Sequence, residues 1–277
     1  MTTIAEALRE AIESLPDGMD RTDAEYLLAH VLEKPRAWLY AHADDELAPA
    51  HWQVFRGLQA RRKAGEPVAY LTGQRGFWSL DLKVNADTLI PRPETERLVE
   101  LALAFLHPGR PAAVLDLGTG SGAVALAIAS ERPLSQVTAV DISPAALAVA
   151  SANGRQLRLA NVFFEHSDWF SSLGGRRFDV IVSNPPYIES DDVHLSLGDL
   201  RFEPRSALAS GPDGLDDIRV ITAQAGQHLL PGGWLLLEHG WQQGAPVRAL
   251  IEAAGFTEVQ TEPDLEGRDR VSLGRLG

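Results

Sequence analysis

From residue 112 onward, strand-like and helix-like segments alternate regularly along the chain. In chain order the segments are "AAVLDLG", "GAVALAIASE", "QVTAVD", "PAALAVASANGRQL", "VFFEH", "FDVIVSN", a helix near 214–229, "WLLLEH" and "APVRALIEAAG". Strands that alternate with amphipathic helices pair in parallel through right-handed crossovers. The sequence therefore predicts an α/β protein with a doubly wound, mostly parallel sheet that binds its ligand at the carboxyl ends of the strands.

The chain before this alternation has a helical pattern. Residues 22–25 match a capping box in front of apolar positions at 26, 27, 31 and 32, and a second helix is predicted after Pro49, with Trp52, Phe55 and Leu58 on one face before "GEP" ends it. We expect a helical domain over residues 1–75 and a linker over 76–92, in which "FWSLDLKVN" forms a strand pair. The α/β domain is then predicted over 93–277, with a first helix near Glu94.

Composition and charge exclude several classes of protein. The 277 residues contain no cysteine, which excludes disulfides, thiolate metal sites and a cysteine nucleophile. The formal net charge of -13 disfavours a large nucleic-acid surface, which needs a basic face. The first 15 residues lack the basic and apolar regions of a signal peptide, and no apolar run approaches the ~20 residues of a membrane span. We therefore expect a cytoplasmic protein. We expect no bound metal, because the eight histidines do not cluster.

Three glycines stand where the first strand of the alternation turns into a helix, in "LDLGTGSGA". Gly118, Gly120 and Gly122 allow a ligand to approach the backbone and leave the helix N-terminal amides facing it. The spacing also satisfies the dinucleotide pattern G-x-G-x-x-G/A, so the loop alone does not separate cofactor types. A tight turn without a ligand is the structural alternative. We expect a nucleoside-type cofactor at this loop.

Polar and aromatic residues end the next two strands. Asp141 lies about 20 residues past the glycines, from where a carboxylate can accept both ribose hydroxyls. Its structural alternative is a helix cap, but Ser143 before Pro144 already offers an N-cap and leaves Asp141 freer for a ligand. Asp168 and Trp169 end the third strand and combine an acceptor with an aromatic wall for an adenine, unless Trp169 only packs in the core.

The fourth strand ends in Asn184-Pro185-Pro186-Tyr187. The two prolines donate no backbone hydrogen bond and hold their neighbours extended, which leaves carbonyls available as acceptors. With the Asn184 side-chain carbonyl and the flat Tyr187 ring, these residues predict a clamp for a planar group that carries an NH2. A proline-rich turn is the alternative. We call residues 184–187 the amide clamp.

These residues carry a resemblance to a known family. "DLGTGSG", Asp141, Asp168 and "NPPY" look like class I S-adenosylmethionine-dependent methyltransferases that modify amide or exocyclic nitrogens. The resemblance narrows to the bacterial release-factor glutamine methyltransferases, which are protein-(glutamine-N5) methyltransferases acting on class 1 peptide chain release factors. The further segments that carry it are "FW" (77–78), "IPRPETE" (90–96), "SDWF" (167–170), "RFEPRSAL" (201–208) and "LLLEHGWQQG" (235–244).

The resemblance implies a seven-stranded, mostly parallel Rossmann-like sheet, S-adenosyl-L-methionine as the cofactor and a release factor as the protein substrate. We expect a monomer. The resemblance places the methionine end of the cofactor on Gly118, Thr119, Gly120, Ser121 and Gly122, its ribose on Asp141, its adenine on Asp168 and Trp169, and the substrate glutamine on Asn184, Pro185, Pro186 and Tyr187. In this scheme Asn184, Pro185 and Tyr187 are the catalytic residues, and Asn184 also borders the cofactor.

Three other functions fit parts of the pattern. A DNA adenine-N6 methyltransferase uses similar NH2 chemistry, but it must flip a base and hold a polyanion, for which this acidic chain has no evident basic region. An NAD-dependent oxidoreductase could share the glycine loop, yet it would have no use for the amide clamp. A non-catalytic cofactor-binding protein would not need an intact clamp. We interpret the helical domain as a docking module for the partner, with a purely structural lid as the alternative.

Overall fold

The computed structural model describes residues 2–13 and 21–277, in two compact units that divide between Gln74 and Arg75. The described helices of the smaller unit are α1 (Ile4–Glu13), α2 (Arg21–Leu32), α3 (Arg36–Ala41), α4 (Pro49–Lys63) and α5 (Val68–Thr72). Their apolar faces meet in one core that includes the fully buried Leu28, Leu39 and Phe55. This core gives the smaller unit its own source of hydrophobic stabilisation.

The helix predicted after Pro49 is confirmed as α4. Pro49 is its first residue, where a missing N–H costs nothing because the first amides of a helix have no intrahelical acceptor. Phe55 is buried, and Trp52 and Leu58 pack against the same core from partly buried positions. The helix ends at Lys63, just before the "GEP" segment.

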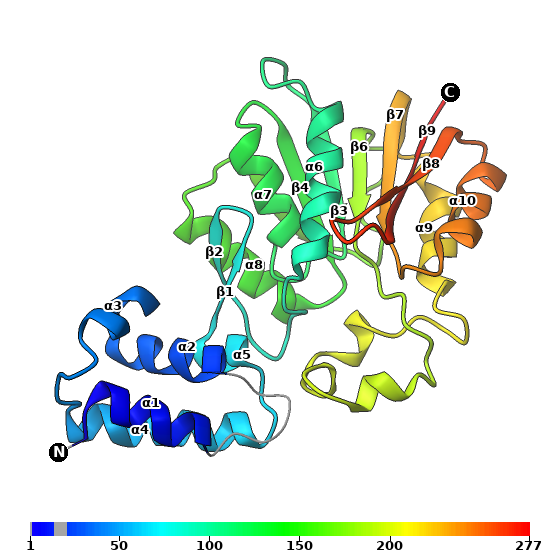
Figure 1. The fold of residues 1–277 in the computed structure, drawn as a ribbon. Helices are drawn as coiled ribbons and strands as arrows, with labels where there is room; N and C mark the ends of the chain where they lie inside the picture. Colours follow the sequence, from blue (N-terminus) through cyan, green and yellow to red (C-terminus); the bar gives the residue numbers. More distant parts are fainter. Residues whose placement is uncertain (1, 14–20) are drawn as a thin grey trace. The chain divides into compact units, whose positions relative to one another are not determined.

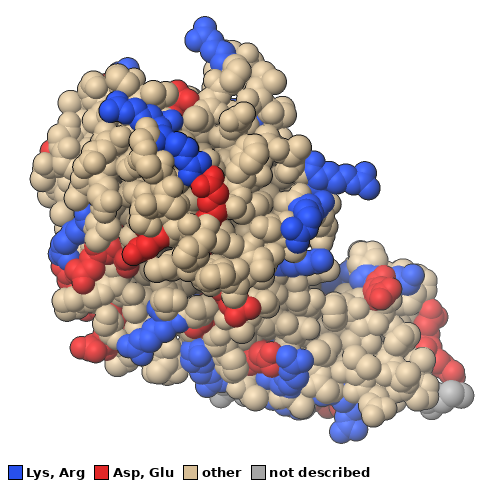
Figure 2. All heavy atoms as spheres, turned by 180° about the vertical axis from the view of Figure 1, so that it is seen from behind, with Lys and Arg blue, Asp and Glu red and all other residues tan. Residues whose placement is uncertain are grey.

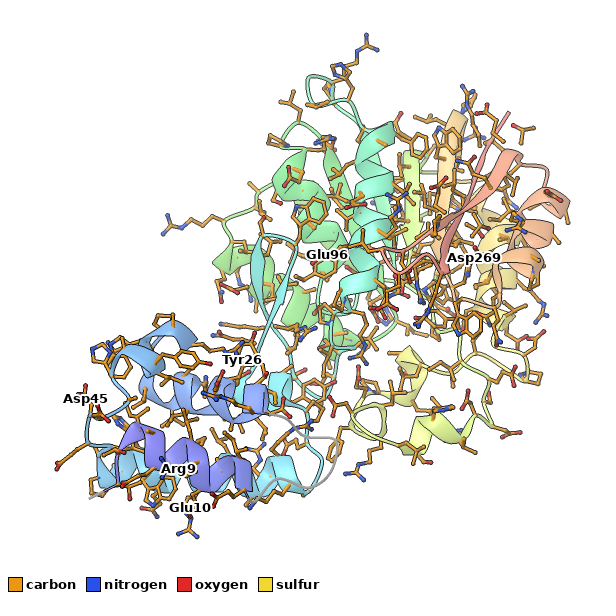
Figure 3. The ribbon with its side chains drawn as sticks, viewed as in Figure 1. Arg9, Glu10, Tyr26, Asp45, Glu96 and Asp269 are labelled. Atoms are coloured by element: carbon orange, nitrogen blue, oxygen red, sulfur yellow. The ribbon has the colours of Figure 1, made fainter. Side chains whose placement is uncertain are left out.

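The predicted capping box at residues 22–25 is wrong. Thr22 lies inside α2, and Glu25 does not reach back to it. Glu25 is 1% exposed, and its carboxylate accepts hydrogen bonds from Arg21 (2.6 Å), Arg36 (2.7 Å) and Tyr40 (2.6 Å). Tyr26, which is labelled in Figure 3, was expected in the core but is 49% exposed. Its ring lies under the Arg36 guanidinium. Two arginines and a tyrosine from α2 and α3 therefore share Glu25 as their common acceptor.

Removing this acceptor is expected to destabilise the smaller unit. Burial raises the pKa of Glu25, but hydrogen bonds from Tyr40, Arg36 and Arg21 outweigh that effect and lower the pKa to about 2. Glu25→Ala should lower the free energy of unfolding by about 1.5–3 kcal/mol at pH 7, as for hydrogen bonds to a charged group. Because the folded pKa is depressed, the difference from wild type should shrink as the pH falls from about 5 towards 2.

Urea unfolding at several pH values checks this prediction, with Glu10→Ala as the control. Glu10 is an exposed glutamate on α1 (Figure 3). Equal destabilisation by the two substitutions, or a Glu25→Ala effect that persists unchanged at pH 2, would contradict it.

A short hairpin and a 3-10 turn begin the larger unit. The hairpin consists of β1 (Gln74–Phe77) and β2 (Leu80–Lys83), which confirms the strand pair predicted around residues 77–85. Phe77 and Leu82 anchor it in the core of the larger unit, and the Trp78 backbone N–H donates to Glu96 Oε1 at 2.8 Å. Glu96 begins α6 (Figure 3), directly after the 3-10 turn η1 (Pro93–Thr95). The first helix near Glu94 is thus confirmed as η1 followed by α6.

The alternation predicted from residue 112 is confirmed strand by strand (Figure 1). The larger unit contains the helices α6 (Glu96–Phe105), α7 (Ala123–Glu131), α8 (Pro144–Gln156), α9 (Asp216–Ala225) and α10 (Gly244–Ala253). Its main-sheet strands are β3 (Ala113–Leu117), β4 (Gln136–Asp141), β5 (Val162–His166), β6 (Phe178–Ser183), β7 (Leu229–Glu238), β8 (Thr257–Pro263) and β9 (Asp269–Arg275). Three 3-10 turns lie between β6 and α9, namely η2 (Val193–Ser196), η3 (Leu200–Phe202) and η4 (Arg205–Ala207).

The main sheet has seven strands in the order β5-β4-β3-β6-β7-β9-β8. Strands β3 to β7 pair in parallel, and β9 is antiparallel to both β7 and β8. From β3 the chain runs outward through β4 to β5 and then returns to β6 on the other side of β3. This reversal is the switch point at which doubly wound sheets bind their ligands.

Alternating residues of the central strands fill two cores, one on each face of the sheet. Val114, Val180 and Val182 face a core shared with α6 and α7. Leu115 and Ile181 face a second core shared with α9 and α10. α8 packs against β4 and β5, so α6, α7 and α8 cover one face while α9 and α10 cover the other (Figure 1). Packing on both faces holds the carboxyl ends of β3, β4, β5 and β6 in fixed positions.

Candidate active site

A cavity of ≈ 450 Å³ opens at the carboxyl ends of β3 to β6, within the usual size range of small-molecule sites. We call it the strand-end cavity. The predicted site residues that line it are Gly118, Gly120, Asp141, Asp168, Trp169, Asn184 and Pro186. Thus each of the four predicted strand ends contributes to one cavity. Thr119, Ser121, Gly122, Pro185 and Tyr187 are not among its lining residues.

The glycine loop between β3 and α7 uses its glycines in two ways. Gly120 has φ +56° and lines the cavity with open space where a Cβ would lie, so a ligand can approach its backbone. Gly122 has φ +87°, and a Cβ there would lie 2.9 Å from Leu126 Cδ1 and 3.2 Å from Ala150 Cβ. Gly122 therefore permits close packing of α7 and α8, while Gly120 leaves the cavity open.

Buried polar groups hold the loop in place from behind. The Asp116 carboxylate accepts from Thr119 Oγ1 at 2.7 Å and from the Ala125 N–H at 3.2 Å. Burial raises the pKa of Asp116 to about 7, although these two hydrogen bonds oppose the rise. Asn153 on α8 donates to the Ser121 carbonyl at 2.9 Å. Thr119 and Ser121 thus belong to the loop but do not line the cavity, and their hydrogen bonds fix the loop backbone.

Asp141 ends β4 with both carboxylate oxygens pointing at backbone amides. Gly120 N–H donates to Oδ2 at 2.9 Å, and Ser143 N–H donates to Oδ1 at 2.8 Å. Ser143 caps α8 as predicted, by accepting from Ala146 N–H. Asp141 is therefore not the helix cap that was its structural alternative, but two loop amides already bind its carboxylate. Each oxygen nevertheless keeps acceptor capacity, and the two amides fix the carboxylate at the cavity wall.

Trp169 follows β5 in an unusual backbone conformation, with φ +45°. Such angles are uncommon for a non-glycine residue and mark positions held by their surroundings. A Cβ at Gly118 would lie 3.4 Å from Trp169 Cζ3, so the indole ring passes close to the glycine loop. The ring also packs partly against the second core. Trp169 therefore both packs in the core, which was its structural alternative, and forms part of the cavity wall. Asp168 beside it is exposed.

The amide clamp follows β6. Asn184 is half-buried and donates from Nδ2 to Thr95 Oγ1 at 3.2 Å, which leaves Oδ1 as its free acceptor. The Tyr187 hydroxyl donates to Glu238 Oε1 at 3.4 Å, and the Tyr187 carbonyl accepts from Gln243 Nε2 at 3.0 Å. Burial and the Glu238 charge raise the pKa of Tyr187, so its hydroxyl stays protonated. Asn184 and Pro186 border the strand-end cavity, whereas Tyr187 points towards β7.

Sequence reasoning missed several residues around this site. Ala86, Asp87, Asp217 and part of segment 204–209 also line the cavity. Two segments quoted only for their resemblance contact each other, because buried Glu203 accepts from the Ile90 N–H at 3.0 Å and pairs with Arg92. Thr95 and Glu238 lie inside quoted segments as well. The segments that carry the resemblance contain Thr95, Glu203 and Glu238, but the sequence alone gave no role to these single residues.

Within 2–13 and 21–277, none of the helices has the length and apolar composition to cross a membrane. Over the same ranges, three or more histidine, aspartate or glutamate side chains nowhere gather so that they could bind a metal ion.

Comparisons with known proteins cover both units. The family described as "PrmC N-terminal domain" matches residues 6–73, and that described as "Methyltransferase small domain" matches 99–210. The release factor glutamine methyltransferase of Xylella fastidiosa (strain 9a5c) is 56% identical over 257 residues, 93% of this chain and 94% of the relative. That of Escherichia coli (strain K12) is 50% identical over 269 residues, 97% of each chain.

A solved methyltransferase structure from Pyrococcus furiosus shares the fold. Its TM-score is 0.54 at 20% sequence identity, over 80% of this chain and 98% of that one. The similarity of fold and the high identity to curated relatives over nearly the full chain agree with each other. The chain belongs to the release factor glutamine methyltransferase family.

Proposed function

We propose that this protein methylates the N5 amide nitrogen of the glutamine in the Gly-Gly-Gln motif of class 1 peptide chain release factors, with S-adenosyl-L-methionine as methyl donor. The position of Asn184 carries the proposal. Its side chain borders the same cavity as the glycine loop and Asp141, so an amide acceptor and a cofactor-type cradle share one site. The names of the relatives that are 56% and 50% identical support the choice of substrate.

The residues present fit the cofactor. Gly120 offers open backbone to the methionine end and Gly118 lines the same cavity beside the Trp169 ring, with Thr119, Ser121 and Gly122 holding that loop from behind. Asp141 offers carboxylate oxygens to the ribose, and its two backbone partners hold them in place. Trp169 supplies an apolar wall, with exposed Asp168 as an acceptor for the adenine amino group. When bound, S-adenosylmethionine supplies a methyl group activated by a sulfonium.

The amide clamp would perform the chemistry by positioning. A carboxamide nitrogen is a weak nucleophile because its lone pair is delocalised into the carbonyl. Asn184 Oδ1 and the Pro185 carbonyl would accept the two N–H groups of the substrate amide, with Pro186 and Tyr187 framing its plane. This arrangement favours pyramidal nitrogen and directs its lone pair to the methyl group. The protonated product is acidic enough to lose its proton to water, so no strong base is assigned.

The surface supports a protein partner. On the face of the larger unit seen in Figure 2, basic and acidic side chains are interspersed. Together with the net charge of -13, this favours a partner other than a nucleic acid. The proposal includes a monomeric, cytoplasmic enzyme, because its release-factor substrate takes part in translation, and a docking role for the helical unit.

A first test of the cofactor site is Asp141→Ala. The carboxylate would hold the ribose hydroxyls, so its loss should weaken S-adenosylmethionine binding by about 1.5–3 kcal/mol, the range for hydrogen bonds to a charged group. Calorimetry measures the affinity. Asp45→Ala, at an exposed aspartate of the smaller unit, is the control (Figure 3). Unchanged affinity in Asp141→Ala would show that another residue binds the ribose.

The proposed reaction has a direct assay. Labelled methyl transfer from S-adenosylmethionine is measured on purified release factor, on the same factor with its Gly-Gly-Gln glutamine replaced, and on DNA. Label only on the intact factor is expected. Label on DNA adenine with the factor untouched would overturn the substrate assignment.

A further inference from the structure

A glutamine side chain binds the last residue of the amide clamp from outside the strand-end cavity. Gln243 is half-buried and lies in the loop between β7 and α10, directly before the helix. Its Nε2 donates to the Tyr187 carbonyl at 3.0 Å and to the Asp213 carbonyl at 3.4 Å. Its Oε1 accepts from the Gly240 N–H at 2.8 Å. Three segments of the larger unit therefore meet at one side-chain amide, and both of its hydrogens are used.

Two glycines leave the space that this amide occupies. Gly214 has φ +72°, and a Cβ there would overlap the Tyr187 carbonyl oxygen and lie 2.8 Å from Gln243 Nε2. A Cβ at Gly240 would lie 2.9 Å from Gln243 Oε1. Real Cβ atoms do not come this close to a neighbour, so a side chain at either glycine would displace the amide or the carbonyl. The chain is thus packed closely around the bond between Gln243 and Tyr187.

The clamp has few ways to bend between its two ends. The rings of Pro185 and Pro186 fix their φ angles. A residue that precedes a proline is also held near the extended region, which restricts Asn184 and Pro185. The tetrapeptide therefore moves largely as one piece, and its orientation is set where its ends are attached.

The two ends of the clamp are attached by different hydrogen bonds. At its start, Asn184 Nδ2 donates to Thr95 Oγ1 at 3.2 Å. At its end, the Tyr187 carbonyl accepts from Gln243 Nε2 at 3.0 Å, and the Tyr187 hydroxyl donates to Glu238 at 3.4 Å. The bond to Gln243 is the shorter of the two at Tyr187, and it acts directly on the backbone of the clamp.

We propose that Gln243 is a positioning residue for methyl transfer, which holds the Tyr187 carbonyl and thereby sets the direction of the Pro185 carbonyl that accepts from the substrate amide. The inference rests on the proposed function, because it concerns the same clamp. Gln243 is not among the residues that line the strand-end cavity, so it acts through Tyr187 and not through the cofactor. Its loss should reduce turnover and leave cofactor affinity unchanged.

Gln243→Glu separates the two ends of this side chain. The variant has nearly the same shape, and its carboxylate still accepts from the Gly240 N–H, so the loop before α10 keeps its contact. Its other oxygen faces the Tyr187 carbonyl, where two acceptors then repel each other. Turnover (kcat) on intact release factor should fall about 10- to 100-fold, the scale for a displacement of up to about 1 Å at a reacting centre.

Gln242→Glu is the matched control. Gln242 is the exposed neighbour of Gln243, and this substitution makes the same change of charge one residue away. Methyl transfer at saturating release factor and cofactor measures kcat, which should stay near the wild-type value in the control, as is usual for a surface substitution. Calorimetry measures S-adenosylmethionine affinity, which should be the same in wild type and both variants. Circular dichroism establishes that the variants are folded.

Two results would overturn the inference. One is Gln243→Glu with the kcat of Gln242→Glu, because the retained Gly240 contact would then be the whole role of the side chain. The other is a loss of cofactor affinity as large as the loss of kcat, since Gln243 would then support the site as a whole and not the clamp.

A second variant decides the matter if Gln243→Glu does not fold. Gln243→Met has a similar length, carries no charge and lacks the bond to Tyr187, so its kcat should also fall while cofactor affinity is kept. Wild-type kcat in Gln243→Met would refute the positioning role. Wild-type protein that binds S-adenosylmethionine but does not methylate release factor would instead overturn the proposed function, and this inference with it.

Discussion

Asn184→Ala is expected to bind S-adenosylmethionine within a few-fold of wild type and to lose about 100-fold or more in turnover on release factor, the scale for one preorganised electrostatic contact. The side chain lines the strand-end cavity but its Nδ2 is bound to Thr95, so its acceptor oxygen is available to the substrate amide. Methyl transfer at saturating release factor and cofactor measures kcat, and calorimetry measures cofactor affinity.

The separation of the two measurements is the control. Loss of cofactor affinity equal to the loss of turnover would show that Asn184 serves the cofactor alone. Turnover near the wild-type value would show that the clamp does not act in catalysis. Asn184→Ala removes the hydrogen bond to Thr95 and can therefore lower the thermal midpoint, but it leaves the apolar cores unchanged. The turnover of such a variant would still be informative.

The fold could be predicted because its signals are local and repeated. Apolar strands such as 136–141 and 162–166 were placed with their observed bounds, and the polar residue after each buried strand marked a strand end. The switch-point rule then brings such ends together without knowledge of any contact. Asp141, Asp168 and Asn184 were placed together in this way, and the structure has all three at one cavity.

The parts that could not be predicted depend on partners far along the chain. Residues 22–25 have the form of a capping box, but Arg36 and Tyr40 on the next helix bind Glu25 instead. Thr95 and Asn184 are 89 residues apart, and they meet where α6, which begins directly after Thr95, packs against β6. Periodicity identifies which side chains are buried, whereas the partners of buried polar groups follow from tertiary packing.

The choice of substrate depends on surfaces outside the clamp. The amide clamp recognises a planar NH2 group, which both adenine and glutamine carry, so the four clamp residues do not distinguish them. A single glutamine side chain has little surface to bind. Binding energy from remote parts of a substrate is what positions its reacting centre. The helical unit, which has its own core and matches a family of its own over residues 6–73, is our proposed source of this remote contact.

Intact release factor should therefore be methylated far faster than a short Gly-Gly-Gln peptide, by about 100-fold or more in kcat/KM if remote contacts contribute roughly 3 kcal/mol. Deleting residues 1–74 should remove most of this advantage while cofactor affinity stays within a few-fold, because the strand-end cavity is lined by residues 86–217. Circular dichroism and calorimetry on the shortened chain establish that it is folded and binds cofactor. Equal rates on peptide and intact factor with the full chain would refute the docking role. An unchanged preference for the intact factor after the deletion would place the docking surface on the larger unit, where the segment between β6 and α9 borders the same cavity.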